Sequence, residues 1–216
     1  MRATRILGAL GVALFVSGMA LATDNPDKPI SLPKPQTEGG KPLMQALKDR
    51  QTSRSFSSEK LPEQVLSNLL WAADGINRPD GKRTAPTARN RQEIDVYVAM
   101  ENGLYLYDAK THMLQPVVEK DLRALTGMQP FVKDAPVSLV FVADYAKMGE
   151  GADADKAVMA AADSAFVSQN VYLFCASEGL ATGVRAMIPK DELAQAMKLR
   201  PDQKIVLAQC VGYPKK

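Results

Sequence analysis

ADKAVMAAADSAFVSQNVYLFCASE, residues 154–178, is the stretch that decides the fold. Gly179 follows it directly and can take the left-handed conformation that ends a helix, so we predict one helix over 154–178. Apolar side chains such as Phe166, Val171 and Phe174 lie on most of its circumference, and a helix that is apolar all round must be buried on all sides. In a chain of this size a partner subunit is the natural cover, which predicts a homodimer.

Two shorter helices are expected before this one. The first begins at Pro42, and the second begins at Pro62 and ends at Asp74-Gly75, where glycine can take a left-handed cap. The apolar face of the first helix consists of Leu43, Met44 and Leu47. Short helices are also expected over 121–125 and 191–197.

Strands are expected on both sides of the long helix. The apolar runs that predict them cover 94–100, 104–107, 137–143, 181–188 and 205–211, and Glu101-Asn102-Gly103 forms a hairpin turn. Because helices and strands are interspersed without a βαβ repeat, we predict the α+β class, with a mixed central sheet flanked by helices.

The first 22 residues have the features of a secretory signal. Arg2 and Arg5 precede an uncharged, mostly apolar run, and Ala20-Leu21-Ala22 has the A-x-A pattern of a cleavage site. The run is too short to span a bilayer comfortably, and no second one follows it. We therefore expect cleavage after Ala22 and a periplasmic or secreted protein with no stable membrane span once the signal is removed.

Composition divides the remaining chain into an arm and one domain. Residues 23–41 hold four prolines and Gly39-Gly40 and have too little apolar surface to fold alone, which predicts a flexible arm. Whether the arm crosses to a partner subunit stays open. Residues 42–216 are long enough for a single domain with its own core.

Charge and cysteine content argue against several function classes. Removing residues 1–22 leaves 25 of the 27 basic residues and all 24 acidic ones, so the net charge falls to +1, which argues against nucleic-acid binding. One histidine and two scattered cysteines give no metal-ligand spacing. Cys175 and Cys210 lie in apolar patterns, which favours buried free thiols, although an oxidising compartment would permit a bond.

Two basic segments carry residue types that bind phosphate and heterocycles. Arg50-Gln51-Thr52-Ser53-Arg54 offers two guanidinium groups with hydroxyls between them, and arginine binds phosphate in a bidentate way. Residues 76–92 show no periodicity, and a structureless stretch of that length is more often a binding loop than a connector. The amide of Asn90 in this loop can donate to and accept from the edge of a heterocycle. Taken alone, each segment is also typical of an ordinary basic surface.

A third element is the end of the long helix and the turn after it. The polar residues Ser168-Gln169-Asn170 need partners inside an otherwise apolar helix. The turn Gly179–Gly183 has glycine at both ends and can bring bare backbone up to a ligand. His112, the one histidine, is expected in a surface turn, and Asp163 and Glu178 as surface or interface charges.

In their order and spacing these segments resemble the nitroreductase family. Arg50–Arg54 matches its R-x-S-x-R pattern with threonine in the serine place, and Pro86–Gln92 matches P-S-S-x-N-x-Q. Three further matches are Gln169-Asn170 to a Q-N pair, Gly179–Thr182 to G-L-G-T, and Gly212–Pro214 to G-Y-P. The resemblance covers 42–216. Within the family, Arg83–Pro86 and the hairpin Gly103–Asp108 look most like the peptide azoline dehydrogenases.

The resemblance implies an intertwined homodimer with FMN at each subunit boundary. The residues that it places on FMN are Arg50, Gln51, Thr52, Arg54, Pro86, Thr87, Ala88, Asn90, Thr182, Gly183 and Lys215. Arg50 and Thr52 would contact the phosphate and ribityl chain, and Arg54 the N1/O2 edge of the ring. Asn90 would bond the ring or the ribityl chain, and Thr182 and Gly183 would present backbone groups to the ring. For Lys215 a phosphate contact and a frayed terminus stay open.

The implied function is two-electron transfer, in which the flavin carries the chemistry and no side chain need be catalytic. The expected substrate is a small organic molecule such as a nitroaromatic, quinone, activated alkene or halogenated phenol, or the enzyme runs as a dehydrogenase. Export removes the usual supply of NAD(P)H, so the electron donor stays open. The alternative is a flavin-binding or small-molecule-binding protein of the same fold without turnover.

Overall fold

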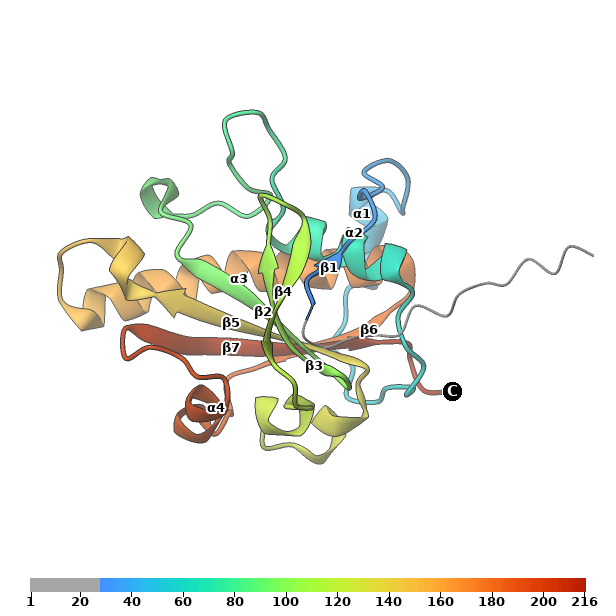
Figure 1. Cartoon of the computed structure of the whole chain (residues 1–216). Coiled ribbons are helices and arrows are strands. Elements are labelled where there is room, and N and C mark those ends of the chain that lie inside the picture. The colour runs from blue at the N-terminus through green and yellow to red at the C-terminus, as the bar shows by residue number, and fades with distance from the viewer. Residues whose placement is uncertain (1–27) are drawn as a thin grey trace, which may run out of the picture.

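A seven-stranded sheet is the centre of the fold in this computed structural model, which describes residues 28–216 (Figure 1). The strand order is β1-β4-β3-β2-β5-β7-β6. The strands are β1 (Ile30–Ser31), β2 (Ile94–Met100), β3 (Gly103–Asp108), β4 (Met113–Val118), β5 (Val137–Asp144), β6 (Ala181–Arg185) and β7 (Gln203–Gly212). The sequence predicted a mixed sheet, but every neighbouring pair of these strands is antiparallel, because β7 inserts between β5 and β6 and runs against both.

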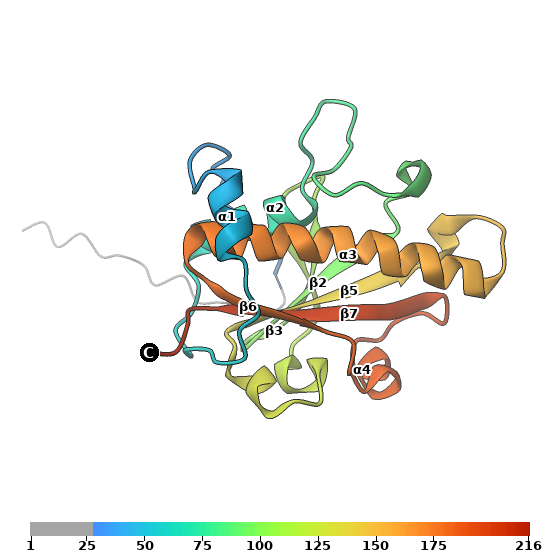
Figure 2. The same ribbon diagram turned by 180° about the vertical axis from the view of Figure 1, so that it is seen from behind.

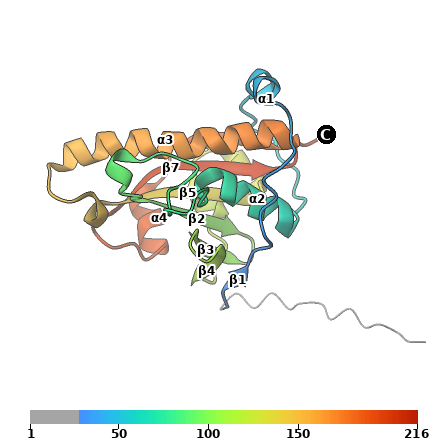
Figure 3. The same ribbon diagram turned by 90° about the horizontal axis from the view of Figure 1, so that it is seen from above.

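Helices cover both faces of this sheet. They are α1 (Leu43–Asp49), α2 (Glu63–Asp74), α3 (Asp153–Glu178) and α4 (Lys190–Ala196), with short 3-10 turns η1 (Ala88–Asn90), η2 (Arg123–Thr126), η3 (Pro130–Asp134) and η4 (Tyr145–Met148). Figures 1 and 2 show α1, α2 and α3 on one side of the sheet and α4, η2 and η3 on the other, and the view from above agrees (Figure 3). The α+β class is confirmed.

Strand β5 shows why the fold has a core on each face. All eight of its residues are buried. Leu139 and Phe141 pack in the core under α2 and α3, whereas Val140 and Val142 pack in the core under α4. Successive side chains of a strand point to opposite faces, so a strand that is buried on both sides is a continuous apolar run.

Two predicted helix ends have different outcomes. Gly179 ends α3 with φ 70° and ψ 24°, the left-handed cap that the sequence predicted. Gly75 after α2 has φ −75° and ψ 160°, so the expected left-handed cap is wrong there. Glycine is required for another reason: a Cβ at position 75 would lie 2.5 Å from the side chain of Trp71.

Two predicted apolar faces are exposed in the single chain. On α1 the side chains of the predicted apolar face, Leu43, Met44 and Leu47, are 63%, 75% and 44% exposed. The α3 outer face (Val158, Met159 and Phe166) is also exposed in one chain, and its cover by a partner subunit stays a prediction. The structure therefore leaves a row of large apolar groups on two neighbouring helices uncovered.

The expected flexible arm lies against the domain from Ile30 onward. Strand β1 pairs with β4, and Leu32 behind it is buried. The Gln36 N–H donates to Asn68 Oδ1 at 2.8 Å, and the Lys41 N–H donates to Ser177 Oγ at 2.9 Å. The signal predicted over 1–22 and the start of the arm lie outside the described residues. In the described part, no helix has the length and apolar character needed to cross a membrane.

His112 holds this arm in place. It lies in a turn, as expected, with φ 53°, but it is half-buried and both ring nitrogens bond to other side chains. Nε2 bonds Ser67 Oγ at 2.7 Å and Nδ1 bonds the Tyr107 hydroxyl at 3.0 Å. Ser67 Oγ in turn donates to the Pro33 carbonyl oxygen in the arm. The expectation of a surface residue is therefore corrected: the imidazole ties three elements together.

Candidate functional site

The segment 50–54 leaves α1 and lies along the edge strand β6. The Ser53 N–H donates to the Thr182 carbonyl oxygen at 2.8 Å, which fixes the segment to the strand. A Cβ on Gly183 would lie 2.7 Å from the Ser53 carbonyl oxygen, so only glycine allows this close approach. Thr182 and Gly183 therefore support the segment, and their contact with a ligand stays a prediction.

Tyr172 on α3 orients two of the predicted residues. Its hydroxyl accepts the Val184 N–H at 3.0 Å and is 2.9 Å from Thr52 Oγ1. Since the Val184 N–H donates to it, the tyrosine hydroxyl is free to donate to Thr52. The Arg50 guanidinium lies over the tyrosine ring, 5.3 Å from its centroid. Tyr172 is a buried aromatic residue, and it also sets the position of the segment.

These contacts form one wall of a pocket of about 510 Å³, called here the Arg50 pocket. Its lining includes Lys41, Lys48, Asp49, Arg50, Gln51, Ser53, Tyr172, Thr182 and Pro214. Three cations face one carboxylate, and that carboxylate is already bound to Lys41 at 2.9 Å. The bond to Lys41 is the main reason that the pKa of Asp49 is lowered. The pocket therefore has net positive charge and a size that suits a small-molecule ligand.

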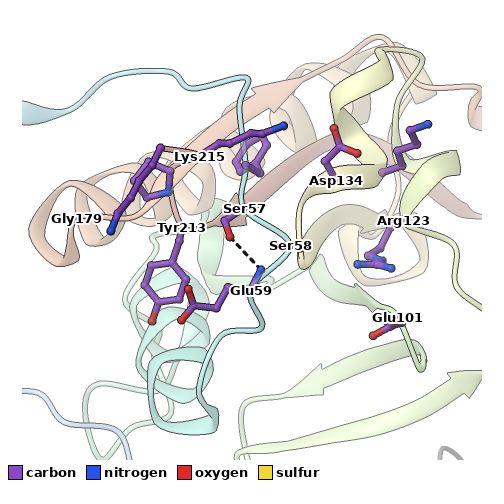
Figure 4. A pocket seen from close by; sticks show the side chains of 13 residues that line it. Ser57, Ser58, Glu59, Glu101, Arg123, Asp134, Gly179, Tyr213 and Lys215 are labelled. Carbon is purple, nitrogen blue, oxygen red and sulfur yellow. Dashed lines mark hydrogen bonds between the residues drawn. The ribbon is translucent and has the colours of Figure 1, made fainter.

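Arg54 and Lys215 lie outside the Arg50 pocket. The Arg54 side chain is exposed on the segment. Lys215 lines a separate hollow with Arg123, Asp134 and Glu101, and Figure 4 shows these mixed charges around it. Pro214 lines both cavities, so the two are neighbours. The structure thus brings Arg50, Gln51 and Thr182 together and leaves Lys215 on the far side of Pro214.

The second predicted cluster forms a strained turn, called here the Asn90 turn (Thr87–Gln92). Arg89, Asn90 and Gln92 have φ of 56°, 53° and 50°. Left-handed backbone is uncommon outside glycine and is costly unless surrounding contacts fix it, and it often occurs at functional sites. The Asn90 side chain is exposed at the tip, and Pro86 beside the turn is exposed as well.

Hydrogen bonds hold the Asn90 turn from inside. Thr87 Oγ1 accepts the Gln92 N–H at 3.0 Å, and Asn90 Oδ1 accepts from Gln92 Nε2 at 3.1 Å. Arg83 then bonds Gln92 and forms an ion pair with Asp74 at 2.8 Å. Burial raises the pKa of Asp74 to about 7, and Arg83 opposes that rise. The loop 76–92 is consequently an ordered support for the turn and not a free connector.

Two acidic residues behind the turn were not recognised from the sequence. Asp163 on α3 is only 3% exposed and accepts the Ala88 N–H at 3.1 Å, so its expected role as a surface or interface charge is wrong. Glu93, directly after the turn, is fully buried. A carboxylate between Ala162 and Ser164, in an apolar helix, was the signal that could have found Asp163.

The Asn90 turn and the 50–54 segment contact α3 at different places. Asp163 and Tyr172 are nine residues apart (172 minus 163), which is about two and a half turns and about 13.5 Å along the helix. Side chains half a turn out of step point to opposite sides, so the two clusters flank the α3 outer face from opposite sides. Figure 2 shows α1 over the C-terminal end of α3 and the loop with η1 over its N-terminal half.

Metal and disulfide chemistry find no support in the described residues. Among residues 28–216 no group of three or more His, Cys, Asp or Glu side chains is placed to hold a metal ion. Cys175 and Cys210 are free and buried, which confirms the prediction of buried thiols. Burial raises the pKa of both thiols.

The α+β fold places a cationic pocket at one end of a long helix and a strained turn with an exposed amide near the other end. This arrangement suits a cofactor-binding enzyme. The sequence model of the Nitroreductase family matches residues 47–213, so the chain belongs to the nitroreductase family, an FMN-dependent family of oxidoreductases. The prediction of an oxidoreductase of this family is confirmed.

Individual relatives agree with this membership. A candidate nitroreductase of Ralstonia eutropha JMP134 is 41% identical, with 89% of this chain and 92% of that chain covered and a TM-score of 0.85. MJ1384, a candidate nitroreductase of Methanocaldococcus jannaschii, is 26% identical over 73% of this chain and 85% of its own length. An NADPH:FMN oxidoreductase of Vibrio harveyi, solved with NAD+, is 17% identical over 81% of this chain and 69% of its own, with a TM-score of 0.61, and shows the fold alone.

Proposed function

We propose that this protein is an exported FMN-dependent oxidoreductase that works as a homodimer on a small organic substrate. Family membership supports the oxidoreductase class and FMN. The basic and apolar pattern of residues 1–22 supports export to the periplasm or beyond. The position of the two candidate clusters on α3 supports the dimer, and this is the observation that carries the proposal.

The residues present fit FMN. Lys48 and Arg50 in the Arg50 pocket supply the cations that a phosphate needs, and Thr52 adds a hydroxyl held by Tyr172. The exposed amide of Asn90 can serve both a donor and an acceptor on a ring edge. When bound, FMN supplies two-electron hydride transfer, while these residues bind it, orient it and keep its charge balanced.

A second copy of the chain brings the two clusters together. In one chain the Asn90 turn and the 50–54 segment lie on opposite flanks of α3 and are offset along it. A two-fold axis that lies in the plane of the α3 outer face, oblique to the helix, brings two copies face to face with their α3 helices crossing. It therefore sets the turn of one copy beside the segment of the other. The second copy then covers Phe166, which is 48% exposed in the single chain.

Substrate and electron donor follow from the compartment and the open site. Nitroaromatics, quinones, activated alkenes and halogenated phenols all accept two electrons, and a dehydrogenase would use the reverse direction. NAD(P)H is not normally supplied outside the cytoplasm, so we propose another donor for the exported enzyme. The finer likeness to peptide azoline dehydrogenases rests on Arg83–Pro86 and Gly103–Asp108 and stays a prediction.

The test is an absorbance spectrum of residues 23–216 after incubation with FMN and gel filtration. We expect about one FMN per chain on a particle of dimeric size. Flavin that is reduced and then reoxidised faster by an organic acceptor than by oxygen would support turnover, whereas reoxidation by oxygen alone would favour a flavin-binding protein. Colourless protein would contradict the proposal and leave the fold standing.

A further inference from the structure

Two carboxyl side chains lie buried behind the Asn90 turn. Glu93 directly precedes β2 and is 0% exposed, and Asp163 on α3 is 3% exposed. Within the described residues, neither side-chain oxygen of Glu93 receives a hydrogen bond from a donor of another residue. A buried ionised carboxylate without hydrogen-bond donors is strongly disfavoured, because it loses its hydration and no protein group replaces the lost hydrogen bonds. The surroundings of Glu93 therefore suit the neutral acid.

Asp163 supplies the partner that a neutral Glu93 needs. Helix α3, which carries Asp163, packs against β2, which Glu93 directly precedes, and both side chains are buried there. Two ionised carboxylates cannot bond, but a protonated one donates to an ionised one. Burial, and then the bond to Asp163, raise the pKa of Glu93 to about 7. Asp163 also accepts the Ala88 N–H at 3.1 Å, so Glu93 and the turn are linked through one carboxyl group.

The neighbouring charged side chains do not stabilise an ionised Glu93 enough to make this proton unnecessary. The charged side chains near the pair are Arg91 of the turn and Asp74 of α2, and Asp74 in turn has Arg83, Asp95 of β2 and Lys147 of η4 as neighbours. Arg91 lowers the pKa of Glu93 and opposes only part of the rise. Asp74 adds a like charge. The nearby guanidinium of Arg83 is already paired with Asp74 at 2.8 Å. Lys147 is bound to Asp95 at 2.6 Å.

We propose that Glu93 and Asp163 share one proton, and that this proton holds the Asn90 turn on α3 in the position that binds FMN; the inference rests on the proposed function. Both are positioning residues. Below about pH 7 the pair is a hydrogen-bonded acid and carboxylate. As the pH rises through that value, both carboxyl groups are ionised and repel each other. The Asn90 turn, which bonds Asp163 through the Ala88 N–H, then moves.

The first test is FMN affinity as a function of pH, measured by quenching of flavin fluorescence. We expect the wild-type affinity to fall roughly tenfold between about pH 6 and about pH 8, since one pKa unit of coupling is tenfold in affinity. Glu93→Gln should lose this dependence, because the amide stays neutral and its NH2 donates to Asp163. Glu192→Gln, an exposed change on α4, is the matched control and should keep it.

The second test needs no FMN. In the FMN-free protein, the infrared difference between wild type and Glu93→Gln should contain the carbonyl band of one protonated carboxyl group, which disappears near pH 7. Asp74, whose pKa is also raised to about 7, contributes to both spectra and cancels in the difference. Absence of this band, or equal pH dependence of FMN affinity in wild type and Glu93→Gln, would overturn the inference. If no variant binds FMN at any pH, the proposed function fails, and the infrared band alone decides the shared proton.

Discussion

Arg50 and Arg54 belong to one five-residue segment but lie in different surroundings. The guanidinium of Arg50 stacks on Tyr172 and faces the Arg50 pocket. The side chain of Arg54 is exposed, four residues further along. A stacked guanidinium is held ready for a bidentate partner such as phosphate, whereas an exposed cation acts on a ligand mainly through its charge. The two positions should therefore affect different properties of bound flavin.

Replacing each arginine by alanine separates the two roles. Arg50→Ala should weaken FMN binding by about 1.5–3 kcal/mol, or roughly ten- to hundredfold, because a charge-assisted bond is lost. Arg54→Ala should change affinity little but make bound flavin harder to reduce by two electrons, since the reduced ring carries negative charge. Fluorescence titration and redox potentiometry measure the two effects. Identical behaviour of both variants and wild type would show that the site is misplaced.

At this scale the sequence predicted residue types well and surroundings poorly. The chemistry of an arginine or an amide side chain is known from the residue type alone. Arg50 and Asn90 could therefore be selected before the structure was known. The pairing of Glu93 with Asp163 could not be predicted, because it depends on the burial of two side chains that lie 70 positions apart in the chain (163 minus 93). Gly183 was selected for access to a ligand, but the backbone of Ser53 fills that space.

Among the elements, the N-terminal segment shows how polar contacts can order a chain of low apolar content. Its prolines and glycines predicted an arm, and only Leu32 is buried with the core. Its other contacts are mostly polar and include the pairing of β1 with β4 and hydrogen bonds to Ser67, Asn68 and Ser177. Such bonds depend on the position of α2 and α3, which composition does not encode. Strand β4 was missed for a related reason, since Pro116 within it lowers the strand signal.

His112 makes the attachment of this segment sensitive to pH. Burial lowers the pKa of His112 below its ordinary 6.5, so the folded protein prefers the neutral ring. The unfolded chain then binds more protons, and the stabilisation is present above about pH 6.5 and lost as the pH falls below it. His112→Ala should lower the free energy of unfolding by about 1–3 kcal/mol at about pH 7, because Ser67 and Tyr107 lose a partner. Urea unfolding at about pH 7 and about pH 5 should show a smaller difference at the lower pH; an equal difference would contradict this assignment.

The whole molecule combines a predictable inventory of elements with an arrangement that the sequence did not reveal. Apolar periodicity located α2, α3, β2 and β5 closely. It could not show that β7 enters the sheet between β5 and β6, because strand order depends on contacts between distant segments. Nor could it show that the apolar residues of α1 and the α3 outer face stay exposed in one chain. Exposed groups of this size on adjacent helices are typical of an interface.

The proposed dimer can be tested at the centre of that surface. Phe166→Arg places a charge on the α3 outer face, where two copies would bury it without a partner, so association should be lost. Because the Asn90 turn and the 50–54 segment then remain on opposite flanks of α3, FMN affinity should fall by at least tenfold as well. Met128→Arg, on an exposed methionine away from the helix, should stay dimeric and bind FMN normally. Sedimentation velocity and flavin titration measure both properties, and a monomeric Phe166→Arg protein that binds FMN like wild type would show that one chain completes the site alone.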